Sequence, residues 1–534
     1  MIHDYIIVGA GSAGCVLANR LSASGKHSVL LLEAGPPDTY PWIHIPIGYA
    51  KTMFNRRVNW CFYTEPESGM NGRKIYWPRG KTLGGSSSIN GLISIRGQRE
   101  DYDAWARAGN RGWSYEDVLP YFRRLEHSVE GENVFHGKDG PLWCSPIGRR
   151  HELIEAVIAA GAELDIPRND DFNGRTQEGV GYYHLTTRKG WRCSAATAYL
   201  KPARRRANLE VLTDARVLSI TLDGTRATGA VFRRKEEDIA VRARREVLLC
   251  AGAIQSPQLL QLSGIGPSAL LSPMGIPVRH DLSGVGENLQ DHLQARIIFE
   301  CSKRITTNDD LQSVWRMARM GLDYVLTRGG PMAVGINQGG AFARTTPAAA
   351  TPDVQFHIAT LSSDTAGSPP HPFSAFTMSV CQLRPKSRGW VRIRSPDPIE
   401  PPAMQPNYLT QPEDSKTLVA GIRLARRCAA TRALAPYVKA EYRPGPDAQS
   451  DEELTEFARN TGGTIFHPSG TCKMGDIRRD PGAVVDDRLR VHGVDALRVV
   501  DCSVMPTLVS GNTNVPVIMI AEKAADMILA DARG

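Results

Sequence analysis

Residues 4–21 read DYIIVGAGSAGCVLANRL and run from an apolar segment through a glycine-rich turn into a second apolar segment. The β-branched run at 4–8 predicts a buried strand. Of the glycines that follow, Gly9 allows a tight turn, Gly11 lets the backbone approach a pyrophosphate, and Gly14 lets a helix pack on the strand. The N-terminus of that helix offers free N–H groups to an anion. The stretch therefore predicts a Rossmann-like dinucleotide-binding unit.

A second apolar run, at 28–32, ends at Glu33. An acid about 20 residues after the first glycine is expected to bind a ribose hydroxyl. Its carboxylate would repel a 2′-phosphate, so NADP is disfavoured. A glycine-rich turn without a ligand is the alternative, but it must explain three glycines and a terminal acid by chance. The motif alone leaves open whether the ligand is NAD or FAD.

The composition is that of a globular protein. The chain has 534 residues, of which 42% are hydrophobic and 22% charged. This balance excludes a disordered or fibrous chain, and the length predicts two to four domains or one interleaved body. No apolar run approaches the ~18 residues of a membrane span, and the start lacks the basic residues of a secretory signal. We therefore expect no transmembrane segment.

Ten scattered cysteines without a CxxC pair indicate reduced thiols in a cytoplasmic protein, with neither a disulfide framework nor a metal site. The net charge of +8 includes two short basic clusters, at 204–206 and 233–235. No aromatic residues interleave with them, so solvated surface charge is favoured over nucleic-acid binding. Weak peripheral contact with an anionic membrane stays open. The oligomeric state is not predicted.

Two further glycine-rich segments occur. Residues 79–91 read RGKTLGGSSSING and lack the ending of a P-loop. Their N–H and hydroxyl donors could hold an anion or the polar edge of a ring, and a plain surface loop is an equal alternative. Residues 247–249 predict a strand, followed by a loop at 250–257 and a helix at 258–263 that ends at Gly264. This indicates a second strand–helix unit.

Together these segments resemble the glucose–methanol–choline (GMC) family of FAD-dependent alcohol oxidoreductases. The layout is most similar to bacterial dehydrogenases or oxidases of primary alcohols. Seven signatures follow in the family's order: GAGSAG (9–14) with Glu33, GKTLGGSSSIN (80–90), GAIQSPQLLQLSGIG (252–266), GVGENLQDHL (284–293), RPKSRGWVRIRSPDP (384–398), HPSGTCKMG (467–475) and VVDCSVMPTLVSGNTNVPVIMIAEKAAD (499–526).

The resemblance implies an interleaved fold that combines α/β and α+β parts. A Rossmann-like FAD-binding domain is built from the discontinuous segments 1–155, 191–300 and 456–534. A substrate domain with an antiparallel sheet takes 156–190 and 301–455. The alternating pattern of residues 376–393 agrees with such a sheet.

The resemblance also identifies the cofactor as FAD and implies its binding residues. Val217 would lie beside the adenine, residues 84–90 would contact the flavin and pyrophosphate region, and Asp501 belongs to the C-terminal FAD segment. Ile89 takes the place of a histidine that some relatives attach to the flavin; it has no nucleophile, so we expect non-covalent FAD. The expected cofactor-binding residues are Gly9, Gly11, Ser12, Ala13, Gly14, Glu33, Ala34, Arg79, Gly84, Ser88, Asn90, Gly91, Val217, Ala251, Gly252, Asp501, Asn512 and Thr513.

Alcohol oxidation needs a base for the hydroxyl proton and a polar group for the oxygen. His467 stands at the break of an apolar stretch into a proline–glycine turn, and its match to the family's histidine segment implies the general base. In the family the second active-site residue is His or Asn, a fixed distance before the last helix, and the resemblance places it at Asn512 here. Asn514 is its near rival, and a helix N-cap is the structural alternative for Asn512. We expect a structural role for His292; His184 could line the pocket but is not favoured.

The expected substrate is a neutral, primary alcohol, with oxygen or another carrier as electron acceptor. A cationic substrate such as choline needs a carboxylate or an aromatic box; the relatives' carboxylate falls on Gln338 here, and no glutamate lies between residues 300 and 400. The expected pocket residues are Gln338, Phe342, Ile465 and Phe466, together with Trp60, although ordinary core positions are an alternative. Competing functions are a hydroxynitrile-lyase-like enzyme, a choline-dehydrogenase-like enzyme, a flavin-binding protein without turnover and an NAD-dependent dehydrogenase.

Overall fold

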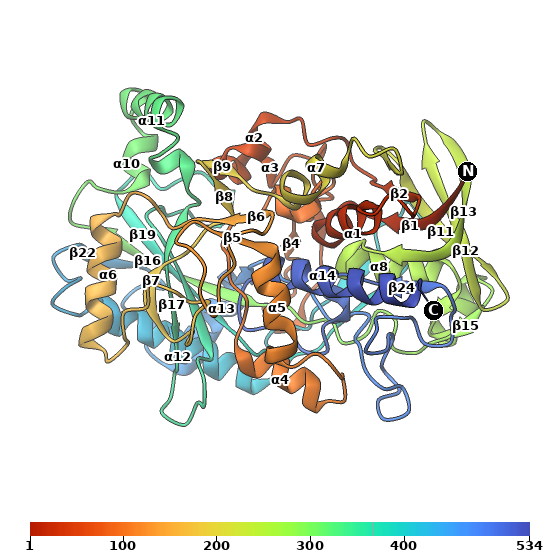
Figure 1. Cartoon of the computed structure of the whole chain (residues 1–534). Helices are drawn as coiled ribbons and strands as arrows, with labels where there is room; N and C mark the ends of the chain where they lie inside the picture. Colours follow the sequence, from red (N-terminus) through yellow and green to blue (C-terminus); the bar gives the residue numbers. More distant parts are fainter. Residues whose placement is uncertain (366, 534) are drawn as a thin grey trace.

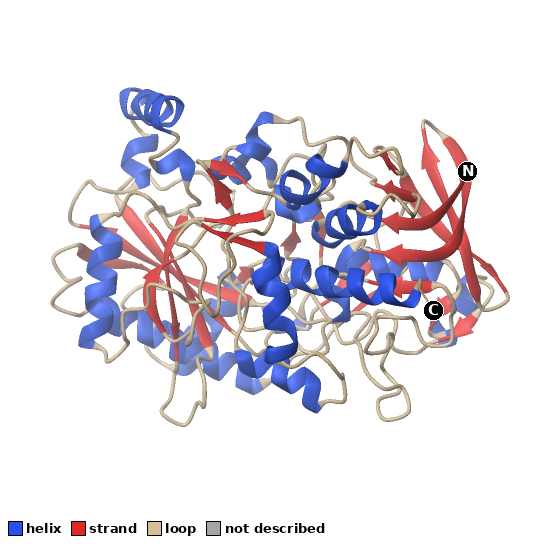
Figure 2. Ribbon diagram, viewed as in Figure 1, coloured by secondary structure: helices blue, strands red, loops and turns tan. Residues whose placement is uncertain are grey.

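Two seven-stranded sheets organise the chain (Figures 1 and 2). The computed structural model describes residues 1–365 and 367–533. Figure 2 shows the strands in two groups, one beside the N-terminus and one at the opposite end of the molecule, with helices around both. The mixed α/β and α+β class expected from the sequence is confirmed.

The first sheet has a parallel core. Its strands read as continuous apolar runs because helices cover both faces of a parallel sheet, and residues 5–8 and 29–32 are accordingly at most 3% exposed. The predicted strands at 4–8, 28–32 and 247–249 all lie in it. In spatial order the parallel strands are β10 (Leu209–Leu212), β2 (Val29–Leu32), β1 (Ile2–Val8), β13 (Glu237–Leu249) and β24 (Leu497–Val499).

Strand β13 is long enough to belong to two pairings. Its C-terminal half pairs in parallel with β1 and β24. Its N-terminal half pairs antiparallel with β12 (Arg226–Arg234), which in turn pairs with β11 (Arg216–Asp223). The residue before β11, Ala215, donates its N–H to the carbonyl oxygen of Glu33 at the end of β2 (2.8 Å). Val217 therefore lies near the carboxyl end of the parallel core, where a nucleotide-binding sheet places its ligand.

Two helices pack on this sheet, and a third packs on the first of them. They are α1 (Ser12–Ser22), α8 (Gly252–Leu262) and α14 (Asn514–Asp531). Helix α14 lies beside α1 although the two are at opposite ends of the chain (Figure 1). Ile518, Met519 and Ile520 point in three directions around α14 and are all fully buried, so this helix belongs to the core.

Helix α8 starts earlier than the sequence suggests. We expected a helix at 258–263, because Pro257 lacks the N–H that an internal helical position donates. The structure begins the helix at Gly252 and keeps Pro257 inside it. The hydroxyl of Thr471 donates to the carbonyl oxygen of Ala253 (2.7 Å), the acceptor that Pro257 leaves free. A partner far along the chain thus removes part of the cost of the proline.

The second sheet is antiparallel and forms the other half of the molecule. Helix α12 (Pro412–Ala429) packs against it, and all eight residues of β19 are buried. The antiparallel sheet expected for the substrate domain is confirmed. Its strands, in spatial order, are β22 (Val438–Arg443), β16 (Leu293–Cys301), β19 (Ala375–Gln382), β18 (Val354–Ala359), β17 (Asn337–Ala343) and β7 (Gly179–Tyr182), with β23 (Gly463–Thr464) paired to β16.

Two of these strands lie in segments that the sequence assigned to the FAD-binding domain. All of β16 but Cys301 falls within 191–300, and β23 falls within 456–534, yet both strands pair in the second sheet. The chain passes from the signature at 284–293 into β16 without a change in composition. No local signal in the sequence therefore marks the point where the chain leaves the first sheet and enters the second. We propose domain borders near residue 292 and near residue 465.

The remaining longer helices surround the two sheets. Helix α11 stands out from the body at the edge of the second sheet (Figure 1). These helices are α4 (Arg99–Arg107), α5 (Tyr115–Leu125), α6 (Glu152–Glu163), α11 (Val314–Thr327) and α13 (Asp451–Thr461).

Candidate active site

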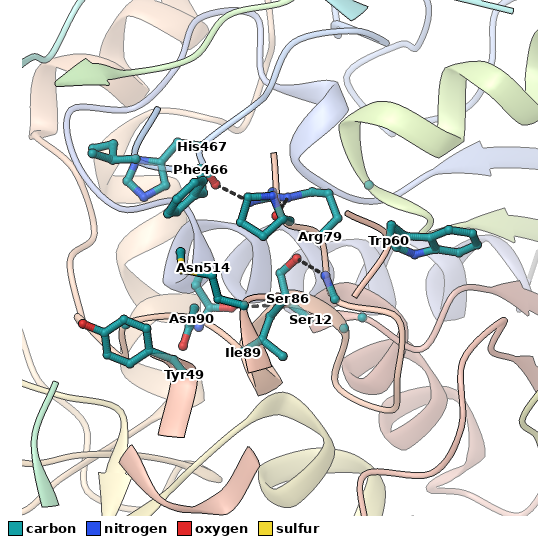
Figure 3. A pocket seen from close by; sticks show the side chains of 18 of the residues that line it. Ser12, Tyr49, Trp60, Arg79, Ser86, Ile89, Asn90, Phe466, His467 and Asn514 are labelled. Atoms are coloured by element: carbon teal, nitrogen blue, oxygen red, sulfur yellow. Dashed lines mark hydrogen bonds between the residues drawn. The ribbon is translucent and has the colours of Figure 1, made fainter. Parts of the chain in front are cut away.

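A cavity of about 1010 Å³ lies between the two sheets. The turns after β1, β2 and β13 line one end, and side chains of β16, β18 and β19 line the other. Figure 3 shows His467 and Phe466 on one side of this space and Ser86, Ile89 and Asn90 of the glycine–serine loop on the other. The cavity is thus bounded by both glycine-rich loops, the second sheet and the C-terminal segment.

The first glycine-rich turn is packed too closely for side chains at two of its glycines. Gly9 has φ +98°, and a Cβ there would lie 2.7 Å from the carbonyl oxygen of Cys250. A Cβ on Gly14 would lie 1.9 Å from the carbonyl oxygen of Gly9. At Gly11, which faces the cavity, the nearest atom to such a Cβ is 3.9 Å away. The turn is therefore a backbone cradle open on the ligand side, as a bound pyrophosphate requires.

The glycine–serine loop docks directly on this turn. The N–H of Gly84 donates to the carbonyl oxygen of Ala10 (2.7 Å), and the hydroxyl of Ser88 donates to the carbonyl oxygen of Leu83 (2.7 Å). Gly84 and Ser88 shape the loop, while Asn90 and Gly91 line the cavity. This segment is part of the cavity wall rather than a plain surface loop, and its contact with a ligand stays a prediction.

Glu33 lies at the end of β2 with only 5% of its surface exposed. Its two carboxylate oxygens accept the N–H groups of Ala10 (2.9 Å) and Gly35 (2.8 Å). Burial raises the pKa of Glu33 to about 7, against the lowering effect of these two bonds. The carboxylate lines the cavity and has lone pairs left for hydroxyl groups. The residues present thus fit a dinucleotide with a free ribose.

His467 follows β23 and is held by a buried carboxylate. Its backbone N–H donates to Oδ1 of Asp291 (2.7 Å), and the hydroxyls of Thr464 and Tyr408 donate to Oδ2 of the same residue. Phe466, directly before it, has φ +72°, a conformation that is uncommon for a side chain of this size. The local strain and the Asp291 bonds together turn the imidazole into the cavity.

The hydrogen bonds around His467 assign its tautomer. Nε2 of His292 donates to the carbonyl oxygen of Leu383 (3.0 Å), so Nδ1 of neutral His292 carries no proton. This Nδ1 accepts the proton on Nδ1 of His467 (3.0 Å). Nε2 of His467 then has a free lone pair, which faces the amide nitrogen of Asn512 (3.2 Å), a group that can only donate. The contacts of His467 with His292 and with Asn512 both indicate that Nε2 is the basic atom.

Asn512 is fixed by a further bond on the other side. Its Oδ1 accepts from Nε2 of Gln355 on β18 (3.1 Å), so its amide nitrogen must point to His467. It is not the N-cap of α14, because that position is Thr513. Asn514 instead accepts the hydroxyl of Ser12 (2.8 Å; Figure 3), which ties the helix start to the first glycine-rich turn. The structure brings Asn512, and not Asn514, to His467.

The imidazoles in this region are uncharged at neutral pH. Burial lowers the pKa of His292 to about 4 and that of His357 to about 3. Burial also lowers the pKa of His467 well below its usual value, and the neighbouring His292, His357 and Arg79 lower it further. A neutral imidazole is the form that can take a proton.

Most of the expected site residues line this one cavity. Gly14, Gly84 and Ser88 shape the loops from behind. The expected residues on the wall are Gly9, Gly11, Ser12, Ala13, Glu33, Ala34, Trp60, Arg79, Asn90, Gly91, Val217, Ala251, Gly252, Ile465, Phe466, His467, Asp501, Asn512 and Thr513.

Two expected pocket residues lie elsewhere. Phe342 is fully buried in the core and packs edge-on against Phe172. Gln338 is buried in β17, and its neighbour Asn337 faces the cavity in its place. Consecutive side chains of a strand point to opposite faces. An alignment with the family motif that is wrong by one residue therefore assigns the cavity position to Gln338 instead of Asn337. Nε2 of His184 lies 3.0 Å from a carboxylate oxygen of Glu130, and His184 does not line the cavity.

Sequence reasoning missed the residues that the second sheet contributes. Gln355 and His357 on β18, and Gln294 and Arg296 on β16, all face the site. A signal was present on β18: residues 354–359 read VQFHIA, in which polar and apolar side chains alternate. Such alternation indicates a strand with one face toward a polar space.

Comparisons with known proteins agree with this geometry. Two family models described as GMC oxidoreductase match residues 3–294 and 385–521. The chain is 42% identical to the alcohol dehydrogenase [acceptor] of Pseudomonas putida over 99% of this chain and 96% of that protein. It is 43% identical to the mitochondrial choline dehydrogenase of Homo sapiens, over 98% and 89%. A solved structure of an Aspergillus oryzae formate oxidase variant, concerned with FAD modification, superposes with a TM-score of 0.93 at 25% identity, covering 100% and 99% of the two chains.

Proposed function

We propose that His467 is the base that removes the hydroxyl proton of an alcohol substrate. The chain belongs to the GMC oxidoreductase family and is an FAD-dependent enzyme acting on CH–OH donors. One observation carries the proposal: Nε2 of His467 is unprotonated and faces Asn512 inside the cavity. The alternatives of a protein without turnover and of an NAD-dependent enzyme are set aside by the family.

FAD, when bound, accepts a hydride from the carbinol carbon. Gly11 and the N-terminus of α1 would hold its pyrophosphate, Glu33 its ribose hydroxyls, and Val217 would lie beside the adenine. Arg79 donates to the carbonyl oxygen of Phe466 (2.6 Å; Figure 3) and would keep the loop of His467 against the bound cofactor. Ile89 lines the cavity without a nucleophile, which supports non-covalent FAD; acid precipitation should then release all of the flavin.

The proton path uses groups of the protein alone. The substrate hydroxyl takes the place of the Asn512 amide at Nε2 of His467 and donates to that nitrogen, and the amide of Asn512 then donates to the substrate oxygen, which stabilises the developing alkoxide. His292 accepts from Nδ1 of His467 throughout, so the positive charge that arrives on His467 is partly shared through that bond. Asn512 cannot take a proton at this pH and serves only to orient the oxygen.

The cavity favours a substrate without positive charge. The cationic side chains on its wall are Lys51, Arg79, Arg216 and Arg296, whereas its carboxylates, Glu33 and Asp501, lie at the nucleotide end. A trimethylammonium group beside the second sheet would meet like charge. The choline dehydrogenase relatives make choline the second candidate, but the wall charges argue for a primary alcohol that is not cationic.

The test of the function is anaerobic flavin reduction by a panel of alcohols. Neutral primary alcohols are expected to bleach the flavin absorbance. Secondary alcohols and choline are expected to bleach it poorly. A hydroxynitrile-lyase-like enzyme would cleave a cyanohydrin without bleaching. Admitting air afterwards reports whether oxygen accepts the electrons, because a dehydrogenase would stay reduced until another carrier is added. An enzyme that no alcohol reduces would refute the proposal.

The pH dependence of kcat/KM is expected to lack an acid limb near 6.5. The base must be neutral, an imidazole is neutral above its pKa, and burial together with His292, His357 and Arg79 lowers the pKa of His467. The rate constant should therefore stay level as pH falls through 6.5, the value of a free imidazole, and decline only below it. A profile that halves at or above pH 6.5 would show that another group is titrating.

Replacing Glu33 is expected to weaken FAD binding. At a pH well above 7, where Glu33 is ionised, Glu33→Gln removes the charge that accepts two N–H groups and the ribose hydroxyls, and charge-assisted hydrogen bonds contribute about 1.5–3 kcal/mol. The dissociation constant of FAD should rise by roughly one to two orders of magnitude, measured by flavin fluorescence during titration of the apoprotein. Glu210→Gln, on the neighbouring strand β10 and partly exposed, is the matched control. Equal affinity in both variants would remove Glu33 from the binding site.

We propose a cytoplasmic location, supported by ten free cysteines. Within residues 1–365 and 367–533, every helix is too short or too polar to cross a bilayer. Weak peripheral membrane contact stays a prediction. Helix α11 would be the contact element, because its Trp315 is 86% exposed and tryptophan is favoured at membrane interfaces.

A further inference from the structure

Arg296 lies on the wall that the second sheet gives to the cavity. Side chains alternate along a strand, so His292, Gln294 and Arg296 share one face of β16 and the residue before it. His292 holds the imidazole of His467 (3.0 Å). Arg296 therefore faces the same space as the proposed base, with about 13 Å along the strand between its Cα and that of His292.

The guanidinium of Arg296 has no partner among the described residues. Burial lowers the pKa of Arg296, and Tyr49, rather than a carboxylate, is the neighbour that raises it. The two carboxylates of the cavity, Glu33 and Asp501, already accept backbone N–H groups, and Asp501 also accepts a serine hydroxyl. The other arginines of the wall differ: Arg79 and Arg216 both donate to backbone carbonyl oxygens.

An unpaired cation in this position needs an explanation. Arg296 is half-buried and faces the cavity. A guanidinium cannot give up its charge in a protein, so a substrate that covered it without offering a partner would leave a buried, unpaired charge, which is costly. The pyrophosphate of FAD does not supply the partner, because its cradle belongs to the first sheet. A planar guanidinium matches the two oxygens of a carboxylate with two parallel hydrogen bonds.

We propose that Arg296 binds an anionic group of the substrate, and that the alcohol oxidised by this enzyme carries a carboxylate at the end opposite its hydroxyl group. The inference rests on the proposed function and adds one feature to it: the reacting end of the substrate is an uncharged alcohol group, and the far end carries a carboxylate. His467 receives the hydroxyl proton at one end of the cavity, and Arg296 fixes the carboxylate at the other.

The first test measures binding without turnover. Unreactive carboxylates of increasing length (butanoate, hexanoate and 4-methylbenzoate) are titrated into the oxidised holoenzyme by calorimetry, beside the neutral alkanol or arene of the same length. We expect the carboxylates to bind and Arg296→Gln to weaken them about 10- to 100-fold, as loss of a charge-assisted pair implies. Arg296→Lys should recover part of the affinity. Lys51→Gln, which removes a different cation of the same wall, should change it about twofold or less.

The second test measures flavin reduction by ω-hydroxy acids and by the diols of equal length. Wild type should favour the acid over the diol, and Arg296→Gln should raise KM for the acid about 10- to 100-fold and so remove most of that preference. The inference would be overturned by equal KM values for acid and diol, or by carboxylate binding that Arg296→Gln leaves unchanged. Either result would leave the proposed oxidation of alcohols intact. If no alcohol reduces the flavin, the proposed function fails, and the calorimetric titration still decides the role of Arg296. Phosphonate and sulfonate analogues that bind more tightly than the carboxylate would overturn the choice of acid.

Discussion

His467→Ala is expected to slow anaerobic flavin reduction by a saturating alcohol about 10²- to 10⁴-fold, the usual contribution of a positioned general base. The reason is geometric: Nε2 of His467 is the atom left unprotonated by its two neighbours. Without it, Asn512 can still orient the oxygen, but water must take the proton. Stopped-flow absorbance of the flavin measures the rate directly.

Raising the pH is expected to recover part of the lost rate in His467→Ala, because a substrate alkoxide no longer needs a base. The flavin content should stay that of wild type, since no cofactor-holding bond is removed. His280→Ala, in β15 (His280–Asp281) and outside the cavity, is the control and should behave as wild type. A His467→Ala enzyme that reduces its flavin at the wild-type rate would remove this imidazole from the chemistry.

Those parts of the fold could be predicted whose sequence signals lie within one short segment of the chain. Strand β1, the glycine turn and α1 are consecutive, and their apolar periodicity and glycine spacing are sufficient to identify them. The pairing of β16 with β23 joins segments far apart in sequence, and no composition change marks the crossing between domains. The start of α8 also escaped prediction, because a distant hydroxyl, that of Thr471, stabilises the helix around Pro257.

In the site, too, residues of local motifs could be predicted from the sequence, whereas contacts between distant segments could not. His467 and Asn512 belong to short motifs at the C-terminal end, and motif spacing was enough to bring them forward as candidates. The groups that set their protonation are not adjacent in sequence: His292 meets His467 from 175 positions away, and Gln355 meets Asn512 from 157. Phe342 was misplaced because an apolar side chain on a strand serves the core as readily as a pocket.

His292→Leu is expected to reduce kcat by about 10²- to 10⁴-fold, although His292 does not face the substrate oxygen. His292 accepts the Nδ1 proton of His467, and this bond selects the tautomer with a free Nε2. Losing the bond that orients a catalytic imidazole can leave it in the wrong tautomer, at a cost of up to about 10⁴ in rate. His467 would then offer a proton where it should accept one. Steady-state kinetics should show the loss in kcat rather than in KM.

His292→Asn separates orientation from simple structural support. An asparagine can place its amide oxygen near the former Nδ1 and accept the same proton, so part of the rate should return. His371→Leu is the matched control: His371 is also buried and hydrogen-bonded, to Ser362 (3.0 Å), but lies outside the cavity, and its loss should lower the melting temperature more than kcat. If His292→Leu and His371→Leu lower kcat equally, His292 only supports the fold. If His292→Asn is faster than His292→Leu at equal stability, the proton on Nδ1 of His467 controls the base.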